Sequence, residues 1–128
     1  MLTVEPAGTD GDDDDRLDLV FAALASRRRR QIVSTLARHP ASIAQLADEQ
    51  GSSLPAIHRH IVALEDAGVI HRRKSGRVNF VALTRAGLAL AQGWLGGFHT
   101  YWGSDAESLD NYIDGIARAT GAMKGTEE

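Results

Sequence analysis

The stretch from Ile43 to Thr84 constrains the fold most, because it places two short amphipathic helices and a basic hairpin in direct succession. Ser42 is a suitable N-cap for the first helix, and Gly51 ends that helix where a left-handed residue is needed. Ser53 is the N-cap of the second helix, with Pro55 in its first turn. The inward-facing residues of the two helices are Ile43, Leu46, Ala47, Ile57, Ile61 and Leu64. Two helices joined by so tight a turn predict a helix-turn-helix.

The spacing of apolar residues changes after Gly68, where apolar and polar residues begin to alternate as they do in strands. Two short strands around Ser75 and Gly76 predict a hairpin over residues 69–83. The cations of this hairpin are Arg72, Arg73, Lys74 and Arg77. A basic hairpin directly after a helix-turn-helix indicates a winged helix-turn-helix, a mainly α fold with one small β-hairpin.

Amphipathic helices are expected on both sides of this unit. Before it, two helical stretches begin at Leu17 and after Ser26, and Pro40 stops the second of them. After it, Thr84 caps a long helix that glycines weaken, so we expect a kink or an early end near Gly96. A last helix with its own apolar stripe follows.

The 128 residues leave room for one domain. Residues 1–15 include four consecutive aspartates and are expected to be a flexible acidic tail. Residues 16–118 are expected to form the winged domain with its flanking helices, and residues 119–128 a flexible C-terminal tail. Residues 19–90 carry eleven Lys or Arg against four acids, whereas both ends are acidic. This basic middle indicates a polyanion partner, and with the predicted fold we expect double-stranded DNA.

Several classes of function are excluded. No apolar run is long enough for a membrane span and Met1 to Gly11 lacks the pattern of a signal peptide, so we expect a cytoplasmic protein without a membrane partner. The sequence has no Cys, no phosphate loop and no nucleophile elbow, so we expect neither an enzyme nor a cofactor. The histidines that could bind a metal are His39, His58, His60, His71 and His99. These are scattered or diverge on one helix, so no transition metal is expected as effector; an intersubunit site with His99 is the weaker alternative.

The exposed face of the second helix, the recognition helix over residues 53–67, carries the residues expected to read DNA. Arg59 points directly away from the core stripe, with His58 and His60 at the two margins. Ser52 and Ser53 can bond phosphate at the helix start. The expected DNA contacts, including the wing over residues 69–83, are Ser52, Ser53, Pro55, Ala56, His58, Arg59, His60, Arg72, Arg73, Lys74 and Arg77.

The motifs together resemble those of a known family. Val20 to Ser26, with Arg28, Arg29 and Ile32, look like the opening helices of ArsR-type bacterial repressors. The helix-turn-helix and wing are similar in register to that family's at Leu46-Ala47, His60, Leu64, Ala67 to Ile70, Gly76-Arg77 and Leu83-Thr84. The segment Trp94 to Ile113 resembles the non-metal branch, and the resemblance covers about residues 17–115. It implies a homodimeric winged-helix repressor that binds a palindromic operator. His58 departs from the family, in which a small hydroxyl residue often stands there.

The first helix and the two helices after the wing are expected to form the dimer core, because their apolar stripes are too long for one small unit to cover. The expected dimerisation residues are Leu17, Phe21, Leu95, Phe98, Trp102, Leu109, Tyr112, Ile113 and Ile116. A small organic effector is expected near Trp94, Phe98 and Trp102, with control by expression level alone as the alternative.

The sequence leaves two questions open. Arg27 to Arg30 form either a phosphate clamp or a solvated helix start in which two arginines pair with carboxylates. For the whole chain, the competing interpretations are a MarR-like regulator and a winged helix that docks other proteins without DNA specificity.

Overall fold

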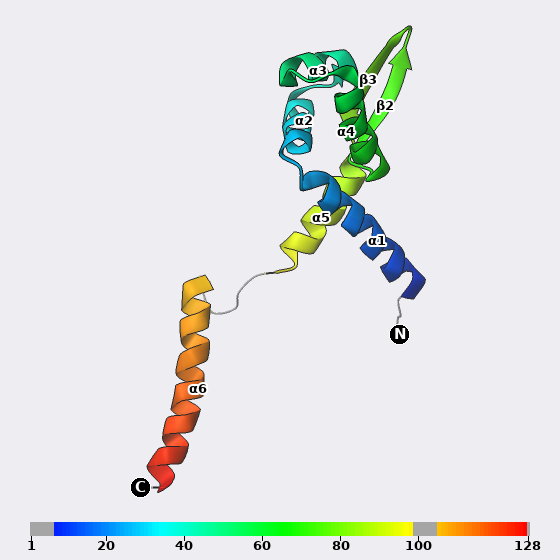
Figure 1. Cartoon of the computed structure of the whole chain (residues 1–128). Coiled ribbons are helices and arrows are strands. Elements are labelled where there is room, and N and C mark those ends of the chain that lie inside the picture. Colours follow the sequence, from blue (N-terminus) through cyan, green and yellow to red (C-terminus); the bar gives the residue numbers. More distant parts are fainter. Residues whose placement is uncertain (1–6, 99–104, 128) are drawn as a thin grey trace. The chain divides into compact units, whose positions relative to one another are not determined.

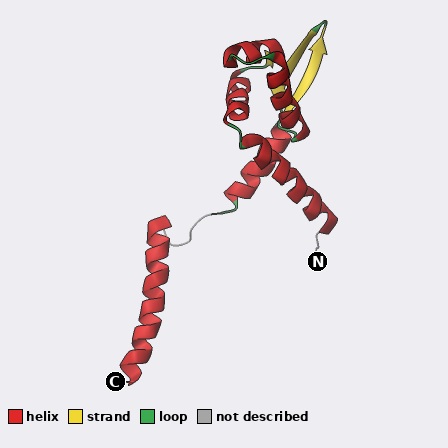
Figure 2. Ribbon diagram, viewed as in Figure 1, coloured by secondary structure: helices red, strands yellow, loops and turns green. Residues whose placement is uncertain are grey.

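The computed structural model describes residues 7–98 and 105–127, which form two compact units, Met1–Leu95 and Gly96–Glu128. Along the first unit, the elements are α1 (Ala7–Leu24), α2 (Arg27–Arg38), β1 (Ala41–Ser42), α3 (Ile43–Gln50), α4 (Leu54–Asp66), β2 (Ile70–Ser75), β3 (Val78–Leu83) and α5 (Arg85–Gly96) (Figure 1). The second unit contains α6 (Asp105–Glu127). The described part of the chain is therefore mainly α, with a small sheet (Figure 2).

The helix ends of the first unit follow local rules of capping. The hydroxyl of Ser42 accepts from the backbone N–H of Gln45, whose side chain accepts from the N–H of Ser42, so α3 begins with a reciprocal capping box. Gly51 ends α3 with a φ of 62°, the left-handed conformation that favours glycine. The hydroxyl of Ser53 accepts from the N–H of Ala56 at the start of α4. These ends agree with the sequence-based expectation, and they fix the length of the turn between α3 and α4.

The sheet has one strand more than the predicted hairpin. Its order is β1-β3-β2, and both pairings are antiparallel. In the hairpin, Ser75 pairs with Val78, which leaves Gly76, with a φ of 63°, in a two-residue turn. Strand β1 has only two residues, Ala41 and Ser42, and it pairs with Val81 and Phe80 of β3. The third strand ties the base of the hairpin to the segment between α2 and α3.

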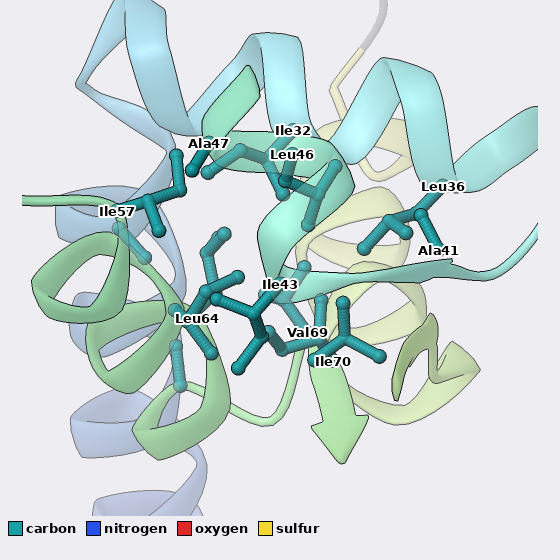
Figure 3. Close-up of a cluster of buried hydrophobic side chains, with 14 of the residues drawn as sticks. Ile32, Leu36, Ala41, Ile43, Leu46, Ala47, Ile57, Leu64, Val69 and Ile70 are labelled. Atoms are coloured by element: carbon teal, nitrogen blue, oxygen red, sulfur yellow. The ribbon is translucent and has the colours of Figure 1, made fainter. Parts of the chain in front are cut away.

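The core gathers between α1, α2, α3, α4 and the base of the sheet. Ile32, Leu46, Ile57, Ile61 and Leu64 are at most 1% exposed, and Figure 3 shows the buried cluster converging from α2, α3, α4 and the hairpin. Leu17 and Phe21 of α1 are half-buried against this cluster. The recognition helix is thus held from behind by the other helices, which leaves its opposite face exposed.

The start of α5 is bonded to the end of α4. Thr84, expected as a helix cap, donates its hydroxyl to the carbonyl oxygen of Gly68 at 3.0 Å, and the N–H of Gly87 donates to the same oxygen at 3.0 Å. A Cβ at Gly87 would lie 2.8 Å from that oxygen, closer than real Cβ contacts. Glycine at position 87 therefore permits this close approach of α5 to the backbone that follows α4.

Helical structure extends further at both ends than expected. Helix α1 begins at Ala7, inside the stretch expected as an acidic tail, and α6 continues to Glu127, through most of the stretch expected as a C-terminal tail. Helix α5 ends at Gly96, where an early end was expected. The flexibility of the two end segments and the domain boundaries stay predictions. No helix in the described ranges is long and apolar enough to cross a membrane.

Candidate nucleic-acid interface

Helix α4 has one fully buried side and one exposed side. Ile57, Ile61 and Leu64 are buried, whereas His58 and Arg59 are exposed and His60 is half-buried. Since successive residues are about 100° apart on a helix, Arg59 lies at the centre of the exposed face and the two histidines lie at its opposite margins. Pro55 and Ala56 precede them on the first turn, and Ser52 and Ser53 stand at the helix start. The structure thus brings these predicted residues together along one helix.

At one margin, Arg72 of β2 joins the hairpin to the recognition helix. Its guanidinium donates to both carboxylate oxygens of Glu65, at 2.7 and 3.2 Å, and lies 3.2 Å from Nε2 of His58. The hydrogen bond from Arg72 lowers the pKa of Glu65, so this carboxylate is charged and paired at neutral pH. Arg72 was expected among the DNA contacts; the structure shows its guanidinium occupied by a carboxylate on α4.

At the other margin, Arg29 of α2 lies against His60. Nη1 of Arg29 is 3.3 Å from Nδ1 of His60, and burial is the largest cause that lowers the pKa of this histidine. The positive charges of Arg29, Arg28 and Arg59 lower the pKa of His60 further. A neutral imidazole can accept a hydrogen bond from Arg29, which makes His60 a contact between α4 and α2.

In the arginine run at the start of α2, Arg28, Arg29 and Arg30 bond to uncharged acceptors rather than to the carboxylates that one interpretation of the sequence expected, whereas the phosphate clamp stays a prediction. Arg29 donates to the carbonyls of Ala23 at 2.6 Å and Ala22 at 3.3 Å, and Arg30 donates to that of Leu24 at 2.8 Å. Arg28 donates to the carbonyl of Gln50 and to the hydroxyl of Ser52, both at 3.0 Å. The last carbonyls of a helix lack intrahelical partners. This rule could have predicted from the sequence that Arg29 and Arg30 donate to the carbonyls at the end of α1.

The wing tip keeps exposed cations. Arg73, Lys74 and Arg77 are exposed, and the ion pairs of the described side chains are Arg16 with Asp13 and Arg72 with Glu65. A cavity of about 510 Å³ lies between the wing and the start of α4, with Pro55, His58 and Arg77 in its lining. The tip therefore presents positive charge beside the recognition helix.

The residues expected in the dimer core fall into two groups. Leu17 and Phe21 already pack inside the protomer, and the ring of Phe21 meets that of Trp94 edge to face with centroids 5.7 Å apart. Leu95, Phe98, Leu109, Tyr112, Ile113 and Ile116 are all more than half exposed. Trp102, Tyr101 and His99 lie outside the described residues. Within the described ranges, no group of three His, Asp or Glu side chains is arranged to hold a metal ion.

This geometry defines a winged helix-turn-helix protein of the DNA-binding class. A family model described as HVO_A0114 matches residues 24–84. The HTH-type transcriptional regulator Rv2034 of Mycobacterium tuberculosis is 35% identical over 72 residues, which are 56% of this chain and 67% of that protein.

Solved structures give the same result at higher coverage. The crystal structure of an ArsR family transcriptional regulator, RHA00566, is 34% identical, with a TM-score of 0.62 over 66% of this chain and 87% of that one. The winged helix-turn-helix domain of Mb0332 from Mycobacterium bovis, described as homodimeric, shares the fold with a TM-score of 0.58 at 21% identity, over 79% of this chain and 99% of that one. The chain belongs to the ArsR family of transcriptional regulators.

Proposed function

We propose that this regulator is a homodimeric repressor that binds a palindromic operator, with α4 in the major groove and the hairpin β2–β3 against the neighbouring backbone. The observation that carries the proposal is the exposed face of α4, which has Arg59 at its centre and an arginine from another element at each margin. A helix about 10–12 Å in diameter fits the major groove. Arginine at such a position can donate two hydrogen bonds to a guanine edge, the commonest base-specific contact.

The exposed stripe of α6 supports the dimer. Leu109, Tyr112, Ile113 and Ile116 follow the spacing of one helix face, and each is at least 51% exposed. In a closed two-fold dimer, two copies of α4 stand about 34–36 Å apart and meet successive major grooves. Such a dimer reads an operator whose two half-sites are related by the same symmetry.

For control of the repressor, we propose a small organic ligand or the expression level alone, and no transition metal. Of the histidines that could bind a metal, His58 and His60 each lie within 3.3 Å of an arginine nitrogen. They diverge on α4 and face different elements, so they are unsuited to share one ion. Operator binding with zinc, nickel, cobalt or a chelator added in turn should therefore match binding without additions.

Selection of bound fragments from random duplex DNA, followed by a salt titration on the winner, tests the proposed function. We expect one palindromic sequence to be enriched, and its affinity to fall steeply with salt because lysine and arginine displace counterions from phosphates. Failure to enrich any sequence, together with partner binding that is indifferent to salt, would favour the protein-docking interpretation.

A further inference from the structure

A basic groove of about 720 Å³ lies between α2 and the end of α3, outside the helix and wing described above. Four arginines of α2 line it: Arg27, Arg28, Arg30 and Arg38. We call this feature the arginine groove. Glu49 is the carboxylate in its lining, and Glu49 accepts a hydrogen bond from the hydroxyl of Thr35 at 2.6 Å. Four guanidinium groups against one carboxylate leave the groove strongly positive.

The arginine groove begins beside the recognition helix. Arg28 donates to the hydroxyl of Ser52, just ahead of α4, and Arg28 and Arg59 both lower the pKa of His60 by their charge. His60 and His58 stand at opposite margins of the exposed face, and the wing contacts the margin of His58. The positive surface therefore continues from Arg59 toward α2, on the side of α4 that lies away from the wing.

The shape of the charge distribution indicates what the groove binds. Arg27 and Arg38 are eleven residues apart on α2, which is about 16 Å along the helix axis at 1.5 Å per residue. Both are exposed, and neither belongs to an ion pair of the described side chains. A row of cations of this length matches a row of phosphates better than it matches one small anion, because each strand of DNA carries a charge about every 3.4 Å.

We propose that the arginine groove binds the phosphate backbone of the DNA strand that borders the major groove on the side away from the wing. The proposal rests on the proposed function. It adds a second set of phosphate contacts to those of the wing, so that α4 is held in the major groove from both sides. Arg28 would link the two features, since it bonds Ser52 and lines the arginine groove.

The double variant Arg27→Gln/Arg38→Gln tests this proposal, because both side chains are exposed and stand outside the ion pairs of the described chain. We expect binding to operator and to random duplex to weaken alike, and the salt slope to fall by about two, one for each lost phosphate contact. Arg85→Gln/Arg118→Gln is the matched control, since it removes two exposed cations, from α5 and α6, that also stand outside the ion pairs of the described chain. The control should keep the wild-type slope, and Arg27→Lys/Arg38→Lys should restore most of it.

Ethylation interference on the operator locates the contacts. Ethylation of a contacted phosphate should weaken binding of the wild type but not of a variant that has lost that contact. The phosphates found in this way for the double variant and for Arg77→Gln should lie on opposite sides of the major groove. If the double variant keeps the wild-type salt slope while Arg77→Gln reduces it, the proposal for the arginine groove is overturned and the proposed function still stands. Thermal stabilisation of the wild type but not the double variant by pyrophosphate, with DNA binding unchanged, would assign the groove to a small anion and also overturns the proposal. A wild type that binds no duplex overturns both proposals.

Discussion

At the scale of single residues, we expect Arg59 to contribute to the recognition of base sequence more than to the binding of the DNA backbone. It is exposed at the centre of the recognition face, whereas Arg29 and Arg72 at the margins are bonded to other side chains. We expect Arg59→Ala to reduce the preference for operator over random duplex by about 1–3 kcal/mol, which is roughly 5- to 150-fold. Competition binding measures this ratio, and Arg85→Ala, a cation on α5, serves as the control. An unchanged ratio would move base reading to Ala56, His58 or the wing.

The lowered pKa of His60 predicts how the free energy of unfolding depends on pH. Its pKa in the folded protein is lowered, first by burial and then by Arg29, Arg28 and Arg59, so the unfolded chain binds the proton more readily. The stabilisation is therefore complete above the ordinary histidine pKa of about 6.5, and it is lost as the pH falls through the lowered value.

His60→Gln should remove this component, because a glutamine oxygen can still accept from Arg29 but does not titrate. Denaturant unfolding at several pH values between neutrality and mild acid measures the effect. The interpretation fails if the free energy of unfolding of His60→Gln depends on pH in the same way as that of the wild type.

The arginine run shows where residue-level prediction stopped. Its charge pointed to phosphates or carboxylates, and the structure pairs Arg29 and Arg30 with carbonyls at the end of α1. Charge alone did not reveal this. The last carbonyls of a helix need hydrogen-bond donors, and which side chain supplies them depends on how the two helices pack together. The same limit applies to Arg72, whose partner Glu65 is seven residues away on another element.

At the scale of elements, the helix ends were the most predictable features. Ser42, Gly51 and Ser53 act within three or four residues of their own positions, so the sequence alone carries the relevant information. Strand β1 was missed because two residues have no period of their own, and their pairing with Val81 and Phe80 is tertiary. The helical state of residues 7–15 was also missed, since four aspartates there indicate solvation rather than conformation.

The pair of Glu65 and Arg72 joins strand β2 of the wing to the recognition helix, and we expect it to position the wing. Both side chains are partly exposed, so we expect Glu65→Gln to cost less than about 1 kcal/mol of unfolding free energy. The pKa of Glu65 is lowered, so the stabilisation is present at neutral pH and is lost as the pH falls through that lowered value.

DNA affinity should respond more strongly than stability to Glu65→Gln, because the wing loses its ion pair and one of its two hydrogen bonds to Glu65 of α4. The measurements are chemical unfolding and operator binding, with Asp66→Asn, an exposed neighbour, as the control. By contrast, Arg77→Gln should leave unfolding unchanged and lower the salt slope by about one. Equal effects of Glu65→Gln and Asp66→Asn on affinity would show that the bond does not position the wing.

The close approach of α5 to the backbone that follows α4 gives a further prediction at the scale of elements. Gly87→Ala would place a Cβ 2.8 Å from the carbonyl oxygen of Gly68 and 2.9 Å from that of Ala67, and both are backbone atoms that cannot rotate away. We expect a loss of roughly 1–3 kcal/mol in the free energy of unfolding, as for overpacked sites. Gly93→Ala on the same helix meets no atom within 4 Å and should stabilise by about 0.5–1 kcal/mol. Thermal melts of the two variants should therefore shift in opposite directions.

At the scale of the whole molecule, we expect dimerisation to depend on apolar side chains that a single chain leaves exposed. Leu109, Tyr112 and Ile113 of α6 are 59, 66 and 51% exposed. Full burial of a large apolar side chain is worth roughly 1.5–3 kcal/mol, so covering the exposed part of each contributes about half of that. Leu17 and Phe21 of α1 are already half-buried in their own protomer, which leaves them less surface for a partner. We therefore expect α6 to contribute more to the dimer than α1.

Leu109→Asp or Ile113→Asp should convert the dimer to monomers and abolish operator binding at the same time. A charge in an apolar interface has no partner, and a single half-site offers too few contacts for stable binding. Asp110→Ala and Asp114→Ala, at exposed acids of the same helix, should leave both properties intact. Sedimentation equilibrium and operator titrations on the same samples provide the measurements. A wild-type monomer at micromolar concentration would contradict the dimer, whereas dimeric Asp variants that still bind operator would move the interface away from α6.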